Sequence, residues 1–309
     1  MISKNSKIFV AGHRGLVGSS VVRRLKIHGF KNILTISKKK LDLTNQSKTY
    51  NYLKKNKPKF IIVCSAKVGG ILANNTFKAE FIYDNLQIQN NLIHNAYINK
   101  INNLIFLGSS CVYPRDCKQP IKEKYLLNGA LEKTNEPYSI AKIAGIKLCE
   151  SYNYQYGTNY LCLMPTNTFG PNDNYNLKTS HFIPALIRKA HELKKSKNKT
   201  LKLWGSGKVR REAIYVDDIA DACIHFMNKK TKKSLINIGF GKDYTIIEFA
   251  KKILNIVGVK ARIKLDRTKP DGTPRKLLDI TEAKKYGWQS KTSLEDGLLK
   301  AYKSFIKSK

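Results

Sequence analysis

The sequence of 309 residues lacks an apolar run of the roughly 18 residues that a membrane-spanning helix requires. Its longest apolar runs, such as residues 60–64 and 104–107, have the length of β-strands. Residues 1–7 also lack the hydrophobic core of a signal peptide and lead directly into a strand-like segment. We therefore expect a protein that stays out of membranes and works in the cytoplasm.

Paired cysteines are absent as well. No CxxC pair occurs, and no group of cysteines and histidines has the spacing of a zinc site. The six cysteines are dispersed at positions 64, 111, 117, 149, 162 and 223. We expect no metal site, and we interpret the cysteines other than Cys111 as reduced, buried and apolar in character.

Acidic side chains are scarce: 22 Asp and Glu stand against 57 Lys and Arg, for a formal net charge of +35. Such a charge favours binding to nucleic-acid phosphates or attraction of small polyanions such as dinucleotides and nucleoside diphosphates. The lysines are dispersed, however, and dense runs such as Lys38–Lys40 fall between periodic segments, where solvated lysines are expected. We attribute the charge to compositional drift, with polyanion attraction as a side effect, and expect no specific nucleic-acid partner.

What the sequence does contain is a regular alternation of strand-like and helix-like segments, and 42% of its residues are apolar. The expected strands are 7–11, 32–36, 60–65, 103–108 and 160–164, and the expected helices are 17–28, 49–57, 77–99 and 136–156. This alternation predicts βαβ units, and hence an α/β protein with a Rossmann-type, doubly wound parallel sheet. Right-handed crossovers bring the carboxyl ends of all strands to one edge, where ligands bind.

The pattern loosens after about Gly170, with a polar segment at 172–177 and a helix expected at 182–194. Two later strand-like segments, 213–216 and 235–238, are expected to return to the main sheet. We predict a dinucleotide-binding Rossmann domain over residues 1–172, with return strands within 211–240. A smaller, discontinuous α/β substrate-binding domain is predicted over residues 173–309.

A glycine motif follows the first expected strand and opens the first helix. It is G-x-x-G-x-x-G, formed by Gly12, His13, Arg14, Gly15, Leu16, Val17 and Gly18. Glycines here permit a tight turn, let the backbone approach a pyrophosphate and allow the helix to pack closely on the strand. Since the helix amino terminus faces the anion, the motif predicts dinucleotide binding.

The end of the second strand predicts which dinucleotide binds. An NAD enzyme carries an acid there to hold the ribose hydroxyls, but this segment ends Ile36-Ser37-Lys38-Lys39. Arg14 and Lys38 are instead placed to hold a 2′-phosphate, which selects NADPH; the alternative is that Lys38 is one more solvated lysine. Asp42 is placed to meet the adenine amine.

A Y-x-x-x-K motif, Tyr138 and Lys142, places both side chains on one face of the helix expected at 136–156. An ammonium near a tyrosine lowers the pKa of its hydroxyl and makes it a better acid–base group near neutral pH. Ser109, just past the strand at 103–108, supplies a second hydroxyl. Together Ser109, Tyr138 and Lys142 form a carbonyl-reducing triad, in which Ser109 holds the carbonyl oxygen, Tyr138 delivers a proton, and Lys142 tunes Tyr138 and grips the nicotinamide ribose.

These motifs, with several others, carry a family resemblance that spans nearly the whole chain. The matching stretches are 11–15 (AGHRG), 66–71 (AKVGGI), 108–114 (GSSCVYP), 135–138 (NEPY), 141–145 (AKIAG), 165–167 (PTN), 204–207 (WGSG) and 269–276 (KPDGTPRK). With them the chain resembles the extended short-chain dehydrogenases and, within these, the GDP-L-fucose synthase family.

The resemblance implies an NADPH-dependent epimerase-reductase. Its substrate would be GDP-4-keto-6-deoxy-D-mannose, inverted at C3 and C5 and then reduced at C4 to GDP-L-fucose. The C4 ketone acidifies the hydrogens on both neighbouring carbons, so one base and one acid can serve both inversions. The resemblance assigns Cys111 as the base and His181 as the opposing acid, and by analogy it implies a homodimer.

The resemblance also implies the residues that line the ligands. Those expected around the cofactor are Leu107, Gly108, Ser109, Ser110, Lys142, Pro165, Thr166, Asn167, Thr168 and His181. Those expected to hold the GDP-sugar are Lys189, Trp204, Arg211 and Asp271. Lys38 and Lys189 stand where arginines are expected, so charge is kept while bidentate phosphate contact is lost.

Three other functions remain open at this point. A colitose-type synthase would reduce a related GDP-keto-deoxysugar after inverting C5 alone. A 4-epimerase or 4,6-dehydratase would regenerate its own cofactor, but Cys111 and His181 argue against it. A non-catalytic nucleotide sensor or nucleic-acid binder would use the charge of +35, but the intact triad disfavours it.

Overall fold

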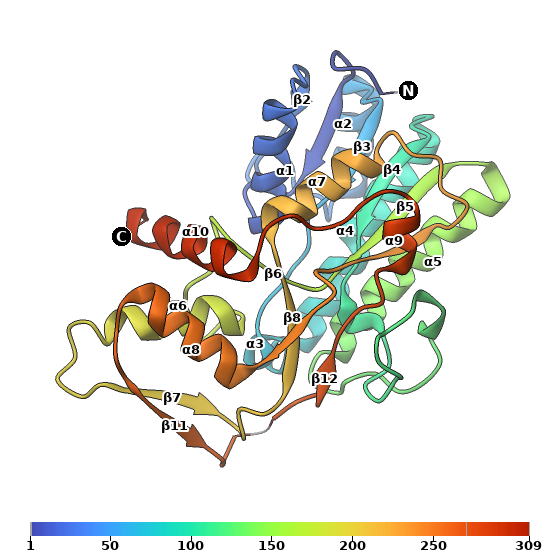
Figure 1. Cartoon of the computed structure of the whole chain (residues 1–309). Coiled ribbons are helices and arrows are strands. Elements are labelled where there is room, and N and C mark those ends of the chain that lie inside the picture. The colour runs from blue at the N-terminus through green and yellow to red at the C-terminus, as the bar shows by residue number, and fades with distance from the viewer. Residues whose placement is uncertain (1, 270, 309) are drawn as a thin grey trace.

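A six-stranded parallel sheet forms the centre of the larger lobe in the computed structural model, which describes residues 2–269 and 271–308 (Figure 1). Its strand order is β2-β1-β3-β4-β5-β9. The strands are β1 (Ile8–Ala11), β2 (Ile33–Leu34), β3 (Phe60–Val63), β4 (Asn103–Leu107), β5 (Asn159–Pro165) and β9 (Leu235–Ile238). The order reverses between β1 and β3, so the sheet is doubly wound and the predicted Rossmann fold is confirmed.

Helices cover both faces of this sheet, which explains why β1 and β3 are buried along their whole length. On one face, α1 (Leu16–Ile27) and α7 (Val216–Phe226) pack around Val10 and Ile62. The other face carries α2 (Gln46–Asn56), α4 (Lys78–Ile98) and α5 (Glu136–Tyr156). Alternate side chains of each strand therefore pack into the two cores on opposite faces of the sheet.

The smaller lobe contains a mixed sheet, a two-stranded ribbon and three packed helices. The sheet comprises β6 (Asn167–Phe169), β8 (Arg210–Tyr215), β10 (Asp243–Thr245) and β12 (Arg275–Lys276), with β8 at its centre. The ribbon pairs β7 (Thr200–Trp204) with β11 (Arg262–Asp266). The helices α6 (Phe182–Glu192), α8 (Ile246–Val257) and α10 (Leu294–Lys307) share one apolar core, and α3 (Ile71–Thr76), α9 (Thr281–Lys285) and two 3-10 turns complete the chain.

One expected return strand was wrong and one is confirmed. Leu235–Ile238 forms β9 and pairs with β5 in the main sheet. The segment 213–216 does not join that sheet: its first three residues lie in β8, which pairs with β6, β10 and β12, and Val216 begins α7. The chain returns to the main sheet through α7 instead, which packs with α1 on one face of that sheet. The domain division at residue 172 remains a prediction.

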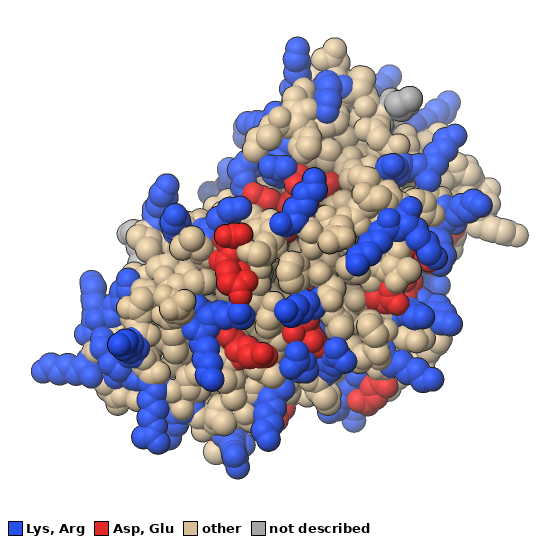
Figure 2. Space-filling view, in the orientation of Figure 1, with Lys and Arg blue, Asp and Glu red and all other residues tan. Residues whose placement is uncertain are grey.

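Lysine and arginine side chains are spread over both lobes on the face shown in Figure 2, and acidic side chains lie among them. They form no continuous basic stripe on that face. In the described residues, no helix is both long and apolar enough to cross a membrane.

Candidate active site

The glycine loop between β1 and α1 is tightly built and leaves its outer side open. Gly12 adopts φ +83°, and a Cβ at Gly18 would lie 2.1 Å from the Gly12 carbonyl oxygen. At Gly15, the residue before α1, the nearest atom to an added Cβ is 3.5 Å away. Beside Gly12, the buried hydroxyl of Ser65 has no hydrogen-bond partner within the described residues. The loop and the helix amino terminus therefore fit a dinucleotide pyrophosphate.

Arg14 and Lys38 are both exposed, and Asp42, a little further along the chain, is partly buried. The Asp42 carboxylate accepts hydrogen bonds from the backbone N–H and hydroxyl of Thr44, at 3.0 and 2.9 Å. The Thr44 N–H is the main cause of the lowered pKa of Asp42, and Lys38 and Lys48 lower it further. Lys38 therefore lies near Asp42, as the predicted adenosine end of the site requires.

The structure brings Ser109, Tyr138 and Lys142 together. Ser109 follows β4 and precedes the 3-10 turn η1 (Ser110–Val112), while Tyr138 lies in the first turn of α5. The Ser109 side chain interacts with the Tyr138 hydroxyl closely enough to lower its pKa. The Lys142 ammonium lies 5.9 Å from the centroid of the Tyr138 ring and donates to the Leu107 carbonyl oxygen at 2.8 Å.

The pKa shifts of Tyr138 and Lys142 differ from those expected from the sequence. Burial raises the pKa of Tyr138, the nearby Cys111 raises it further, and only the Ser109 hydrogen bond opposes them. Burial also lowers the pKa of Lys142 to about 8. The expected lowering of the Tyr138 pKa by Lys142 is therefore not seen, because the ammonium points to a carbonyl and not to the phenol. Tyr138 is held in its protonated form, the form that donates.

Cys111 lies in η1, directly beside this triad. Its N–H donates to the Ser109 hydroxyl at 3.3 Å, and its carbonyl oxygen accepts from the Ser139 hydroxyl at 3.0 Å, which ties η1 to α5. The Lys276 ammonium approaches the Cys111 sulfur to 3.9 Å. Sequence reasoning gave Lys276 no role. It belongs to the quoted 269–276 stretch, but its contact with Cys111 joins residues 165 positions apart in sequence.

His181 enters from the smaller lobe as the residue before α6. His181 is exposed at the surface. The protein atoms packed around it nevertheless lower its pKa through burial. The loop before it is held to the larger lobe, where the Gly70 N–H donates to the Thr179 carbonyl oxygen at 2.9 Å. A Cβ at Gly70 would lie 2.5 Å from the Ser180 carbonyl oxygen, so this close approach requires glycine.

The expected GDP-sugar residues come from three elements and one loop of the smaller lobe. Arg211 on β8 is half-buried, and Cys111 and Asp271 are near enough to oppose the lowering of its pKa by burial. The Asp271 carboxylate accepts from the Ser206 N–H at 2.7 Å, just after β7. Trp204 ends β7 with 52% of its surface exposed, and Lys189 is half-buried on α6. Arg211 thus lies near both Cys111 and Asp271, and Asp271 contacts the turn that directly follows Trp204. Pro270 lies outside the described residues.

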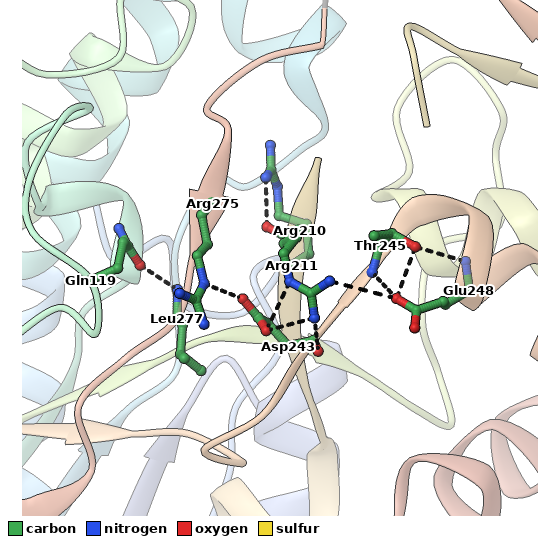
Figure 3. A network of polar contacts seen from close by, with 8 residues as sticks. All are labelled: Gln119, Arg210, Arg211, Asp243, Thr245, Glu248, Arg275 and Leu277. Atoms are coloured by element: carbon green, nitrogen blue, oxygen red, sulfur yellow. Dashed lines mark hydrogen bonds and ion pairs between the residues drawn. The ribbon is translucent and has the colours of Figure 1, made fainter. Parts of the chain in front are cut away.

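Figure 3 shows why Arg211 and Arg210, neighbours on β8, have different surroundings. Arg210 and Arg275 both bind the buried carboxylate of Asp243, Arg210 at 3.0 Å and Arg275 at 2.5 Å. Side chains alternate along a strand, so Arg211 points the other way, as the figure shows. Lys276 pairs in register with Arg211 on the adjacent β12. Asp243 therefore binds Arg210 and Arg275 on one face of the sheet. The other face carries Arg211 and Lys276.

The residues expected to line the cofactor follow the carboxyl ends of β4 and β5. Leu107 ends β4, and Gly108 and Ser110 follow it; a Cβ at Gly108 would lie 2.3 Å from the Met164 sulfur. Pro165 ends β5, Thr166 links it to β6, and Asn167 and Thr168 lie in β6. Thr166 and Asn167 donate to the Glu212 carbonyl oxygen at 3.2 and 2.7 Å. These residues share the sheet edge at which the glycine loop lies, as predicted.

Comparisons with known proteins agree with this geometry. The sequence model of the NAD dependent epimerase/dehydratase family matches residues 8–239. GDP-L-fucose synthase 1 of Arabidopsis thaliana is 48% identical over 308 residues, covering 100% of this chain and 95% of that protein. GDP-L-fucose synthase of Escherichia coli K12 is 47% identical over 311 residues, covering 98% and 97%.

A solved structure also matches the whole chain. The GDP-mannoheptose C4 reductase MlghC from Campylobacter jejuni, with NADP bound, has a TM-score of 0.90 and 36% identity, covering 99% of this chain and 100% of that chain. The chain therefore belongs to the NAD dependent epimerase/dehydratase family.

Proposed function

We propose that this protein converts GDP-4-keto-6-deoxy-D-mannose into GDP-L-fucose, by epimerisation at C3 and C5 and NADPH-dependent reduction at C4. The observation that carries the proposal is the placement of two chemistries in one site. Ser109 and Tyr138, whose side chains interact, serve carbonyl reduction. Cys111, joined to Ser109 through its N–H at 3.3 Å, offers a thiol beside the same carbonyl position. Full-length similarity to GDP-L-fucose synthases supports the assignment.

The residues of the chain perform the following steps. Ser109 holds the C4 oxygen of the sugar, which keeps the neighbouring C3 and C5 hydrogens acidic. Cys111 abstracts each of these hydrogens from one face, and His181 returns a proton to the opposite face. NADPH supplies the hydride for C4, and Tyr138 gives its proton to the C4 oxygen. Lys142 binds the nicotinamide ribose, and the glycine loop holds the pyrophosphate.

The cofactor and substrate contacts form part of the same proposal. Arg14 and Lys38 hold the 2′-phosphate of NADPH, and Asp42 meets the adenine amine. Arg211 binds the diphosphate of the GDP-sugar, Lys189 and Asp271 add polar contacts, and Trp204 offers a flat surface. We further infer a cytoplasmic homodimer with no specific nucleic-acid partner.

The experiment that tests the proposal is incubation of the purified protein with NADPH and GDP-4-keto-6-deoxy-D-mannose. The expected result is stoichiometric NADPH consumption and GDP-L-fucose as the product, identified by NMR. A parallel assay with the corresponding 3-deoxy sugar tests the colitose-type alternative. Faster turnover of the 3-deoxy sugar would replace the proposed substrate, and turnover without NADPH consumption would contradict the reaction itself.

A further inference from the structure

Glu212 is a carboxylate with no exposed surface, and no step of the proposed reaction uses it. It follows Arg211 on β8, at the centre of the smaller lobe's sheet. Burying a carboxylate is costly unless hydrogen bonds satisfy its oxygens. The surroundings of Glu212 therefore show what the protein gains from it.

The carboxylate of Glu212 lies in a cradle of backbone N–H groups. Gly241 donates to Oε1 at 2.6 Å, and Leu278 donates to Oε2 at 2.9 Å. A Cβ at Gly239 would lie 2.4 Å from Oε1, so the turn after β9 has room for this carboxylate only because residue 239 is glycine. Gly241 adopts φ +81°, a conformation that glycine favours. The turn 239–241 is thus built around Glu212.

Glu212 also joins the two halves of the active site. On the cofactor side, its carbonyl oxygen accepts from Thr166 and Asn167. On the side of the base, its carboxylate holds the N–H of Leu278, two positions after Lys276. The Lys276 ammonium in turn lies 3.9 Å from the Cys111 sulfur.

The strand that carries Lys276 is short enough to need such support. β12 has only two residues, and side chains of neighbouring segments bind the chain at each end of it. Before Lys276, Arg275 binds Asp243; after it, the Leu277 N–H donates to the Gln119 side chain at 2.9 Å, as Figure 3 shows. The Leu278 hydrogen bond to Glu212 extends the attachment to β8 that begins with the pairing of Lys276 and Arg211. On the other side, the Ile121 N–H donates to the Leu277 carbonyl oxygen at 2.7 Å.

We propose that Glu212 is a positioning residue that holds Lys276 beside Cys111 and thereby supports abstraction of the C3 and C5 hydrogens. The inference rests on the proposed function, since it assigns Cys111 as the base. Glu212 touches no reacting atom and acts through the backbone of the β12 segment. The Lys276 ammonium lies 3.9 Å from the sulfur that takes the proton, so displacement of Lys276 alters the charge beside the base without removing the base.

The test is Glu212→Gln, which replaces one acceptor oxygen by a donor that faces a backbone N–H. Deuterium exchange at C3 and C5 of the substrate is expected to slow roughly 10- to 100-fold, the scale of a misplacement of about 1 Å. Single-turnover oxidation of GDP-L-fucose by NADP⁺ reports C4 hydride transfer before any epimerisation, and it is expected to stay near the parent rate. Alkylation of Cys111 by iodoacetamide, followed by mass spectrometry of its peptide, is expected to slow as well.

Coupling to Lys276 separates positioning from a general loss of structure. Lys276→Met is expected to slow exchange and alkylation, and Glu212→Gln added to it is expected to cause no further loss, because residues that act as a unit are not additive. Additive losses in the double variant would overturn the proposal. Gly239→Ala, which crowds the same carboxylate without changing its charge, is expected to reproduce Glu212→Gln and serves if that variant does not fold.

The matched control is Glu248→Gln. Glu248 caps α8 through Thr245 and lies 3.9 Å from the Arg210 guanidinium, and in the described residues it has no direct contact with β12. We expect a lower melting temperature with exchange and alkylation unchanged; slowing equal to that of Glu212→Gln would overturn the proposal. A parent protein without C3 and C5 exchange would contradict the proposed function, whereas the alkylation measurements would still decide the role of Glu212.

Discussion

At the scale of single residues, Tyr138 is the proposed donor of the proton to the C4 oxygen. Its hydroxyl lies beside the Ser109 side chain, and burial raises its pKa, which keeps it protonated at neutral pH. Tyr138→Phe removes that proton while it keeps the ring, which packs edge-on against Phe81 at 6.4 Å. We expect kcat for reduction to fall roughly 10²- to 10⁴-fold, the usual contribution of general acid catalysis. Circular dichroism and the melting temperature control for folding, and near-parent NADPH turnover would show that Tyr138 is not the donor.

Lys142 gives a prediction for pH dependence. Burial lowers the pKa of its ammonium to about 8, so the charged form is present below that pH and is lost above it. Because the charged form grips the cofactor ribose in our account, kcat/KM for reduction is expected to fall as pH rises through about 8. Lys142→Arg retains its charge to much higher pH and should remove this limb from the profile, whatever its absolute rate. A parent profile that stays level to pH 10 would contradict the role of the charge.

At the scale of elements, the β1–α1 connection is closely packed at Gly18. Gly18→Ala places a Cβ 2.1 Å from the Gly12 carbonyl oxygen, so strand and helix must move apart. We expect the free energy of unfolding to fall by about 1–3 kcal/mol, as for other overpacked sites. Gly15→Ala is the matched control, since its nearest contact is 3.5 Å. Urea denaturation of both variants measures the difference, and equal stability of the two would show that the loop is not constrained at Gly18.

We propose that the same loop and the end of β2 select the cofactor. Arg14 is exposed beside the helix amino terminus, and no acid follows β2 until Asp42. We expect kcat/KM for NADPH to exceed that for NADH, and Arg14→Ala to raise KM for NADPH far more than KM for NADH. Steady-state kinetics with both cofactors measures this. Equal efficiency with the two cofactors in the parent protein would refute the assignment of the 2′-phosphate site.

The elements of the main sheet follow from local patterns, whereas those of the smaller lobe depend on distant contacts. Buried apolar runs such as Phe60–Val63 and the glycines after β1 can be recognised in the sequence. The sheet that contains β8 does not, because its neighbours β6, β10 and β12 are too short to show a period. For the same reason, sequence patterns identified Ser109, Tyr138 and Lys142 as a triad but gave no role to Lys276 or Glu212.

At the scale of the whole molecule, the site lies where the two lobes meet. The larger lobe contributes the glycine loop, Ser109, Cys111 and Tyr138, and the smaller lobe contributes His181, Arg211 and Lys276. In the proposed mechanism, reduction depends on the larger lobe, while epimerisation needs groups from both. The two activities should therefore be separable by substitution.

Deuterium incorporation in D2O tests this central claim most directly, with GDP-4-keto-6-deoxy-D-mannose, NADPH and Cys111→Ser. A serine hydroxyl is a far weaker base than a thiolate, so we predict loss of deuterium incorporation at C3 and C5, read by NMR. Ser109, Tyr138 and Lys142 remain, so NADPH consumption should persist and yield a product with unaltered configuration at both carbons. The parent protein should incorporate deuterium at both positions. Full double incorporation and a normal product from Cys111→Ser would contradict the account.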